Sequence, residues 1–293
     1  MKAKREPAPV LEVRELAVGY GGRVVLEHLN FSVRRGEIFA IMGGSGCGKS
    51  TLLKHIVGLY PLLSGTVEIL GRKIRDDSWT ELAELSRLFG ITYQGGALLG
   101  SFTLAENVAL PLEEHTDYPP AKIRKIVREK LAMVGLDGFE DYMPAEISGG
   151  MKKRAGLARA LALDPELLFF DEPSAGLDPL MSADLDRLIL RLRQELHSTV
   201  VIVTHELDSV FTVADRIIML DKETRSIAAE GDPRELREHC KVPWVREFLN
   251  RGGLLYGKCA PGAAANGETG DASGNPARAG FQRHSELDEQ ELR

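Results

Sequence analysis

The chain of 293 residues has little of what marks several classes of protein. Three cysteines, Cys47, Cys240 and Cys259, show an odd count and no metal spacing, which argues against a disulfide framework and suits a reducing cytosol. No apolar run approaches the ~20 residues that span a bilayer, and nothing at the start resembles a signal peptide, so a membrane role requires a partner. The net charge is −6, from 37 basic and 43 acidic residues, so no nucleic-acid partner is expected.

What is present is a globular composition, 43% hydrophobic and 27% charged, with a length that favours one or two domains. The composition changes near residue 257, because residues 257–280 are dominated by glycine and alanine. Such a segment buries too little apolar surface to offset the entropy of ordering it. We therefore expect a folded domain over residues 10–252 and a disordered Gly/Ala-rich extension over residues 253–293.

A glycine-rich stretch lies between a buried apolar run at residues 38–42 and the start of a helix at residues 52–57. It reads Gly43, Gly44, Ser45, Gly46, Cys47, Gly48, Lys49, Ser50 and Thr51. This is the G-x-x-x-x-G-K-[ST] pattern in strand–loop–helix context, which predicts a phosphate loop. Glycines let several N–H groups point into one concavity, and the helix adds the positive end of its dipole. Lys49 is expected to reach the β- and γ-phosphates and Ser50 to ligate Mg²⁺, while Cys47 is expected to fill space because no catalytic partner is visible.

Hydrophobic periodicity outlines the rest of the fold. Alternation over residues 10–40, with a Gly21-Gly22 turn, predicts an antiparallel sheet beside the phosphate-loop core. Further expected elements are a hairpin over residues 216–231 and helices over residues 79–89, 103–113, 121–136, 146–163 and 182–197. Tyr20 ends the first β run and has two interpretations, an ordinary strand-end aromatic or a ring stacked on adenine, which spacing does not separate.

Polar side chains also follow three later β runs. Gln94 ends one, Asp171 and Glu172 follow the apolar run at residues 167–170, and His205 follows residues 199–204. Taken singly, a strand-end acidic pair or a lone histidine is more often an ordinary solvated group. Open α/β sheets bind ligands at the carboxyl ends of their strands, so in one sheet these side chains converge with the phosphate loop.

In this order the motifs resemble an ABC-type ATPase domain, and the resemblance covers roughly residues 10–250. It implies an α/β P-loop NTPase with a RecA-like parallel sheet core, an N-terminal antiparallel β subdomain and an inserted α-helical subdomain at about residues 95–160. By the same resemblance, Tyr20 stacks on adenine and Gln94 contacts Mg²⁺ or the attacking water. Asp171 holds Mg²⁺, Glu172 is the general base, His205 contacts the γ-phosphate, and residues 174–178 form the loop that couples two sites.

Ser148, Gly149 and Gly150 resemble the family's signature element, which offers a hydroxyl, two amides and a helix dipole to an anion. In the family geometry this element faces the ATP of a second copy, which implies a head-to-tail dimer with two ATP molecules between the chains. Met151 departs from the usual glutamine, and a thioether cannot make an amide's hydrogen bonds. Side-chain contact from that position is therefore not expected.

A narrower resemblance, over residues 95–99, 106–116 and 148–160, is to the Mce-associated, Mla-type ATPases of phospholipid transport in double-membrane bacteria. It implies an ATP-hydrolysing subunit on the cytoplasmic face of the inner membrane. Its partners would be an Mla-type permease, indirectly a periplasmic Mce-domain protein, and a small cytosolic regulatory subunit. The process would be glycerophospholipid traffic between inner and outer membranes, maintaining outer-membrane lipid asymmetry. The alternatives are an amino-acid or metal importer of the same superfamily, or a soluble ABC ATPase. The charged end at residues 285–293 is either disordered or docks on the neighbouring protomer or a regulator.

Overall fold

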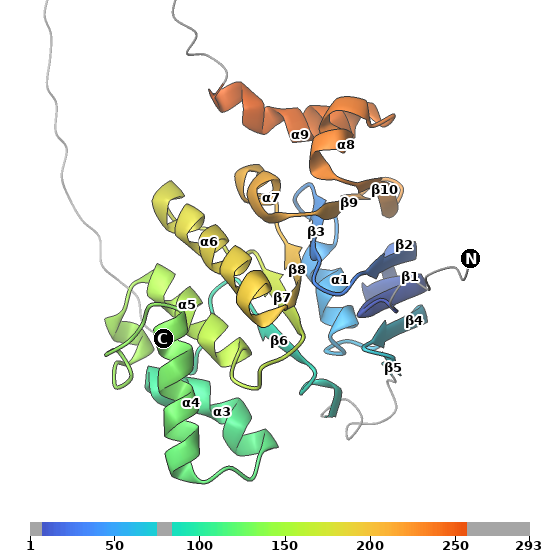
Figure 1. The fold of residues 1–293 in the computed structure, drawn as a ribbon. Helices are drawn as coiled ribbons and strands as arrows, with labels where there is room; N and C mark the ends of the chain where they lie inside the picture. Colours follow the sequence, from blue (N-terminus) through green and yellow to red (C-terminus); the bar gives the residue numbers. More distant parts are fainter. Residues whose placement is uncertain (1–7, 75–83, 257–293) are drawn as a thin grey trace, which may run out of the picture. The chain divides into compact units, whose positions relative to one another are not determined.

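The computed structural model describes residues 8–74 and 84–256, with side chains described as far as residue 250 (Figure 1). By its internal contacts the chain divides into residues 1–256 and 257–293, and the second unit lies outside the described residues. Of the helix expected over residues 79–89, residues 79–83 lie outside them as well, residues 84–85 are helical, and the last residue, Phe89, begins a strand. The last described helix runs on to Tyr256, past the expected domain boundary at residue 252.

The first unit is built on a six-stranded sheet in the order β10-β9-β3-β8-β7-β6. All neighbours are parallel except β9 and β10, which form the expected antiparallel hairpin. The strands are β3 (Ile38–Gly43), β6 (Phe89–Thr92), β7 (Leu167–Asp171), β8 (Thr199–Val203), β9 (Arg216–Asp221) and β10 (Ser226–Gly231).

The central strands β3, β7 and β8 are buried at every position and mostly apolar, because both of their faces are covered. Phe169 packs in the cluster that holds the side chains of α1 (Lys49–Ile56), whereas its neighbour Phe170 packs with the helical layer on the opposite face. Alternate residues of a strand point to opposite faces, so a continuous apolar run is the expected pattern of a doubly covered sheet. Burial on both faces fixes the register of these strands and hence where each strand ends.

A second, antiparallel sheet in the order β2-β1-β4-β5 confirms the sheet predicted from the alternation. Its strands are β1 (Leu11–Tyr20), β2 (Arg23–Val33), β4 (Ser64–Ile69) and β5 (Arg72–Lys73). The β1–β2 loop is Gly21-Gly22, with φ of 57° and 77°. Two positive φ values define the two-residue turn that suits the twist of a hairpin, and glycine adopts them without strain. The inner face of this sheet shares its core with α1.

An all-helical segment is inserted between β6 and β7, as expected (Figure 1). It comprises α3 (Leu104–His115), α4 (Pro120–Met133), the short η1 (Pro144–Glu146) and α5 (Gly149–Ala160). Thr103 and Glu106 form a capping box that fixes the start of α3.

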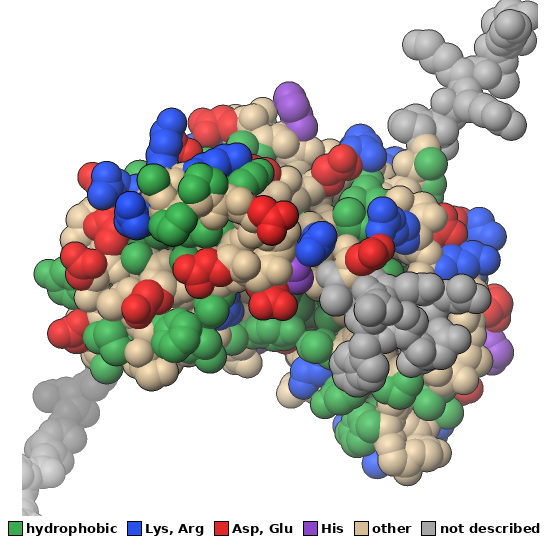
Figure 2. Space-filling view, turned by 90° about the horizontal axis from the view of Figure 1, so that it is seen from below, with side chains coloured by type: hydrophobic (Ala, Val, Ile, Leu, Met, Phe, Trp, Pro, Cys, Tyr) green, Lys and Arg blue, Asp and Glu red, His purple; other side chains and the backbone are tan. Residues whose placement is uncertain are grey.

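On the face of the molecule seen from below, acidic, basic and hydrophobic side chains are interspersed (Figure 2).

The remaining helices follow the strands of the large sheet. They are α6 (Pro179–Leu196), α7 (Leu207–Val213), α8 (Pro233–His239) and α9 (Pro243–Tyr256). Asp178 caps α6 by accepting hydrogen bonds from two backbone amides, and Pro179 follows at the first helical position. Within the described residues no helix is long and apolar enough to cross a membrane.

Candidate functional site

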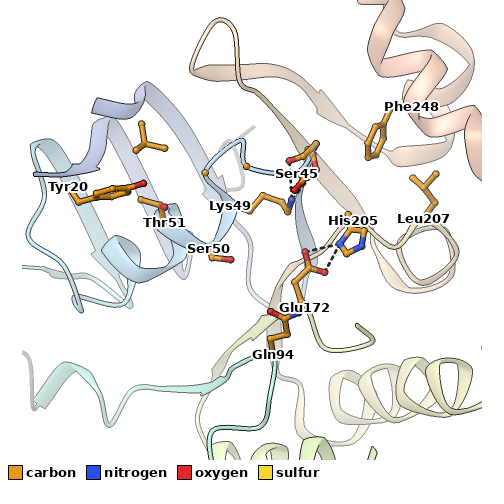
Figure 3. Close-up of a pocket in the computed structure, with 15 residues that line it drawn as sticks. Tyr20, Ser45, Lys49, Ser50, Thr51, Gln94, Glu172, His205, Leu207 and Phe248 are labelled. Carbon is orange, nitrogen blue, oxygen red and sulfur yellow. Dashed lines mark hydrogen bonds and ion pairs between the residues drawn. The ribbon is translucent and has the colours of Figure 1, made fainter. Parts of the chain in front are cut away.

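The predicted site residues follow four strands that are neighbours in the sheet. In spatial order, the phosphate loop follows β3, His205 follows β8, Asp171 and Glu172 end and follow β7, and Gln94 follows β6. Because these strands are parallel, their carboxyl ends lie along one edge of the sheet. A cavity of about 630 Å³ lies at this edge, and its wall includes the loop, Gln94, Glu172 and His205 (Figure 3).

Two glycines fix the shape of the phosphate loop. Gly43 has φ of 152°, and a Cβ there would lie 2.6 Å from the Cys47 sulfur and 2.7 Å from the backbone oxygen of Leu220. Gly48 has φ of 104°, and a Cβ there would meet Val25 at 2.8 Å. Any larger residue at either position would therefore force the loop to move. Cys47 is buried in the fold of the loop, as expected for a space-filling residue.

Lys49 is the first residue of α1, and its ammonium lies inside the loop. The Lys49 Nζ donates hydrogen bonds to the backbone oxygens of Gly43 at 3.0 Å and Gly44 at 3.3 Å. Ser45, Gly46 and Thr51 line the same cavity. The loop thus combines a helix N-terminus with a fixed cation, an arrangement that attracts an anion.

Ser50 and Asp171 place two oxygen ligands side by side next to the loop. The Ser50 hydroxyl donates to Asp171 Oδ1 at 3.1 Å. Burial raises the pKa of Asp171, while the Ser50 hydrogen bond opposes that shift. A hydroxyl and a desolvated carboxylate suit a hard cation such as Mg²⁺, which is usually held by one or two protein oxygens together with substrate phosphates. No group of three or more His, Cys, Asp or Glu side chains able to hold a metal occurs in the described part of the chain.

Glu172 adopts an unusual backbone conformation that directs its carboxylate toward His205. Its φ is 48°, in the left-handed region that costs a non-glycine residue about 1–3 kcal/mol. The Glu172 amide donates to the Val203 oxygen at 2.8 Å, which anchors the residue to the end of β8. Both carboxylate oxygens lie 2.9 Å from His205 Nδ1, and Thr204 Oγ1 donates to one of them at 3.4 Å. Such stored strain is typical of functional positions.

Tyr20 lines the cavity at the end opposite His205 (Figure 3), with 61% of its surface exposed. An exposed ring at the rim can offer its face to a planar group. The structure adds three cavity residues that the sequence pattern did not mark, Val25 of β2, Leu207 of α7 and Phe248 of α9. The place of Phe248 in the wall depends on where α9 folds back, which no local pattern reveals.

Ser148, Gly149 and Gly150 do not line this cavity; they begin α5 in the helical insertion. Ser148 caps α5 by accepting a hydrogen bond from the Met151 amide at 3.3 Å. Gly150 is buried, and a Cβ there would lie 2.2 Å from the Met181 methyl group. A Cβ at position 150 would have to displace the end of the flexible Met181 side chain, whereas Gly149 has open space around it.

Lys153 is a further residue that the sequence did not single out. From α5 its ammonium donates to the backbone oxygen of Pro173 at 2.9 Å and to that of Ala175. Burial lowers the pKa of Lys153, and the charges of Glu172 and Glu206 oppose that shift. Lys153 therefore ties the start of α5 to the segment directly after Glu172. In the sequence it is one of three consecutive basic residues, and nothing local distinguishes it.

The parallel sheet with a glycine-rich loop between β3 and α1 defines the class of P-loop nucleotide-binding proteins. Comparison with known proteins narrows this class, because the family model described as ABC transporter matches residues 26–175. The chain belongs to the ABC transporter family.

Individual relatives agree with this assignment. The chain is 44% identical over 240 residues to the probable ribonucleotide transport ATP-binding protein mkl of Mycobacterium tuberculosis, covering 82% of this chain but only 66% of that protein. It is 42% identical over 227 residues to the intermembrane phospholipid transport system ATP-binding protein MlaF of Haemophilus influenzae, covering 78% and 85%. A dimeric structure of a post-hydrolysis state of the ATP-binding cassette MJ0796, bound to ADP and Pi, superposes with a TM-score of 0.69 at 31% identity, covering 76% and 98%. The expected fold class is confirmed.

Proposed function

We propose that the chain binds Mg²⁺-ATP and hydrolyses it as one of two identical copies that energise a membrane permease. The observation that carries this proposal is the cavity at the ends of β3, β8, β7 and β6, which gathers a phosphate loop, a carboxylate and a histidine. Lys49 and the loop amides would hold the phosphates, and the Tyr20 ring would stack on the base. The experiment is to measure phosphate release by the purified chain with Mg²⁺-ATP, with EDTA as the control.

In this proposal Glu172 orients and deprotonates the attacking water, and His205 contacts the γ-phosphate while its Nδ1 keeps the carboxylate in place. The 2.9 Å contacts from His205 Nδ1 to both Glu172 oxygens support this division of roles. Ser50 and Asp171 would hold the Mg²⁺ ion, with Gln94 near it at the end of β6. The ion would neutralise charge on the phosphates.

The second copy would supply Ser148, Gly149 and Gly150. Their position outside the cavity of their own chain supports a site shared between two chains, and the cassette MJ0796 bound to ADP and Pi is itself dimeric. To test this, Ser45→Cys and Ser148→Cys would be placed on separate copies of a chain whose native cysteines are replaced. We expect a disulfide-linked dimer on mixing the two with Mg²⁺-ATP. Failure to cross-link, although each chain binds ATP, would contradict the shared site.

A groove of about 570 Å³ between β6, α3 and α5 supports a permease partner. Its lining joins apolar side chains, including Ile91, Leu110 and Leu163, to the carboxylates Glu113 and Glu114. It also includes Tyr93, the residue before Gln94, so a helix seated there would lie next to the cavity wall. Leu110→Glu should abolish permease binding and leave hydrolysis by the isolated chain unchanged.

We propose glycerophospholipid as the cargo, moved between the inner and outer membranes, with the chain on the cytoplasmic face of the inner membrane. The 42% identity to the phospholipid transport protein MlaF, over 85% of its length, supports this cargo. An Mla-type permease, a periplasmic Mce-domain protein and a small cytosolic regulatory subunit complete the proposed complex. Because the relative mkl is a probable ribonucleotide transport protein, ribonucleotide is the competing cargo. Analysis of what co-purifies with the native complex distinguishes the two.

A further inference from the structure

A fully buried histidine, His55, lies between the phosphate-loop helix and the strand end that carries Tyr20. Its side chain has no exposed surface although it sits in the last turn of α1. His55 Nδ1 lies 2.8 Å from the backbone oxygen of Thr51, one turn earlier in α1. On the other side of the ring, Nε2 lies 3.3 Å from the amide nitrogen of Gly19 and 3.1 Å from the Gly19 oxygen. One ring therefore bonds to two of the segments that line the cavity, α1 and the end of β1.

Because a carbonyl oxygen only accepts, Nδ1–H donates to the Thr51 oxygen. On the other side of the ring, Nε2 can accept from the Gly19 amide or donate to the Gly19 oxygen. Removing the ring would leave the Gly19 amide without this partner in a buried place, and an unpartnered buried amide is destabilising. The end of β1 would be the part to move, because α1 keeps its own helical hydrogen bonds.

The surroundings show that this strand end has little freedom of its own. A Cβ at Gly19 would lie 2.0 Å from the Arg23 oxygen, so the backbone is packed tightly against the start of β2. The Tyr60 ring meets His55 edge-on at 5.5 Å between centroids. His55 is thus in contact with Gly19, the residue before Tyr20. Tyr20 and Thr51 both line the cavity (Figure 3).

We propose that His55 is a positioning residue that sets the place of Tyr20 relative to the phosphate loop and so determines how much the base contributes to nucleotide affinity. This rests on the proposed function, since it assumes that ATP binds with its base against Tyr20. His55 does not itself line the cavity. Its effect should therefore appear in recognition of the base and be absent from recognition of the phosphates.

The test compares two probes, Mg²⁺-ATP and inorganic tripolyphosphate, on three variants of the full chain. His55→Gln places a polar group where Nε2 lies and can still bond to Gly19. His55→Asn reaches only toward Thr51, and His55→Leu keeps the bulk without hydrogen bonds. An aromatic contact is worth about 0.5–1.5 kcal/mol, so we expect the Asn and Leu variants to weaken ATP binding about three- to tenfold. Tripolyphosphate binding should not change, and the Gln variant should resemble the unaltered chain.

A double-mutant cycle with Tyr20→Ala supplies the second readout. If His55 acts through Tyr20, the Tyr20→Ala/His55→Leu double variant loses no more ATP affinity than Tyr20→Ala alone. Additive losses, equal losses for both probes, or an Asn variant that binds ATP normally would each overturn the inference. The Gln and Asn variants carry the comparison if the Leu variant fails to fold. Absence of ATP binding by the unaltered chain would instead refute the proposed function itself.

Discussion

Replacing Glu172 by glutamine separates ATP binding from ATP hydrolysis. Glutamine has nearly the same shape as glutamate, and its remaining oxygen can still accept a hydrogen bond from His205 Nδ1, which lies 2.9 Å from the Glu172 oxygens. What is lost is the negative charge and the ability to take a proton. A positioned general base contributes about 10²–10⁴-fold to a rate, so the barrier should rise by about 3–5 kcal/mol.

The loss should be confined to chemistry. The His205 side chain is 54% exposed, so its contact with Glu172 should contribute no more than about 1 kcal/mol to stability. We therefore expect a nearly unchanged melting temperature, unimpaired ATP binding, and dimers that accumulate with ATP because hydrolysis no longer separates them. Thermal unfolding, an ATP titration and light scattering with and without Mg²⁺-ATP measure these three properties. Phosphate release measures the loss of hydrolysis.

The matched control is Glu206→Gln, which removes a carboxylate of the same type that does not line the cavity. This control should hydrolyse ATP at the rate of the unaltered chain. Near-normal hydrolysis by Glu172→Gln would refute the general-base assignment. An equal loss in both variants would instead mean that the general charge of the region matters rather than the position of one carboxylate.

Three further predictions concern other parts of the first unit. Lys49→Ala should weaken ATP binding at least about tenfold in a titration, since a charge-assisted bond contributes about 1.5–3 kcal/mol, and unchanged affinity would contradict the phosphate loop. Asp171→Asn should stop Mg²⁺-dependent hydrolysis yet raise the free energy of unfolding at pH 7, because burial raises the pKa of Asp171 and so penalises its charged form. That gain should shrink as the pH falls toward the ordinary aspartate pKa of about 3.9, and a gain independent of pH would contradict it. Arg216→Ala should cost about 3–5 kcal/mol in urea unfolding, because the buried Glu37 carboxylate loses its charged partner, now bonded at 2.7 and 2.9 Å, and keeps only the Arg34 amide; a cost below 1 kcal/mol would contradict this.

The parts of the site that local sequence predicts are those fixed by strand ends. The phosphate loop, Gln94, Glu172 and His205 each follow an apolar run, and the rule that parallel strands end at one edge was enough to bring them together. The same reasoning predicted the antiparallel sheet and its Gly21-Gly22 turn. In these segments local pattern and tertiary packing agree.

The residues that sequence analysis missed owe their positions to contacts between distant segments. Lys153 meets the segment after Glu172 only because α5 packs beside β7, and Phe248 enters the cavity wall only because α9 folds back over the sheet edge. His55 has the appearance of an ordinary helical histidine until Gly19 is found beside it. The left-handed backbone of Glu172 has no sequence signal either, because glutamate does not favour it.

Purification of the native membrane complex, followed by mass spectrometry of its proteins and bound small molecules, is the decisive test of the proposed function. We expect a permease with this chain in two copies and a glycerophospholipid bound to the complex. Recovery of the chain with no membrane partner, or of a permease that carries ribonucleotides and no lipid, would contradict it.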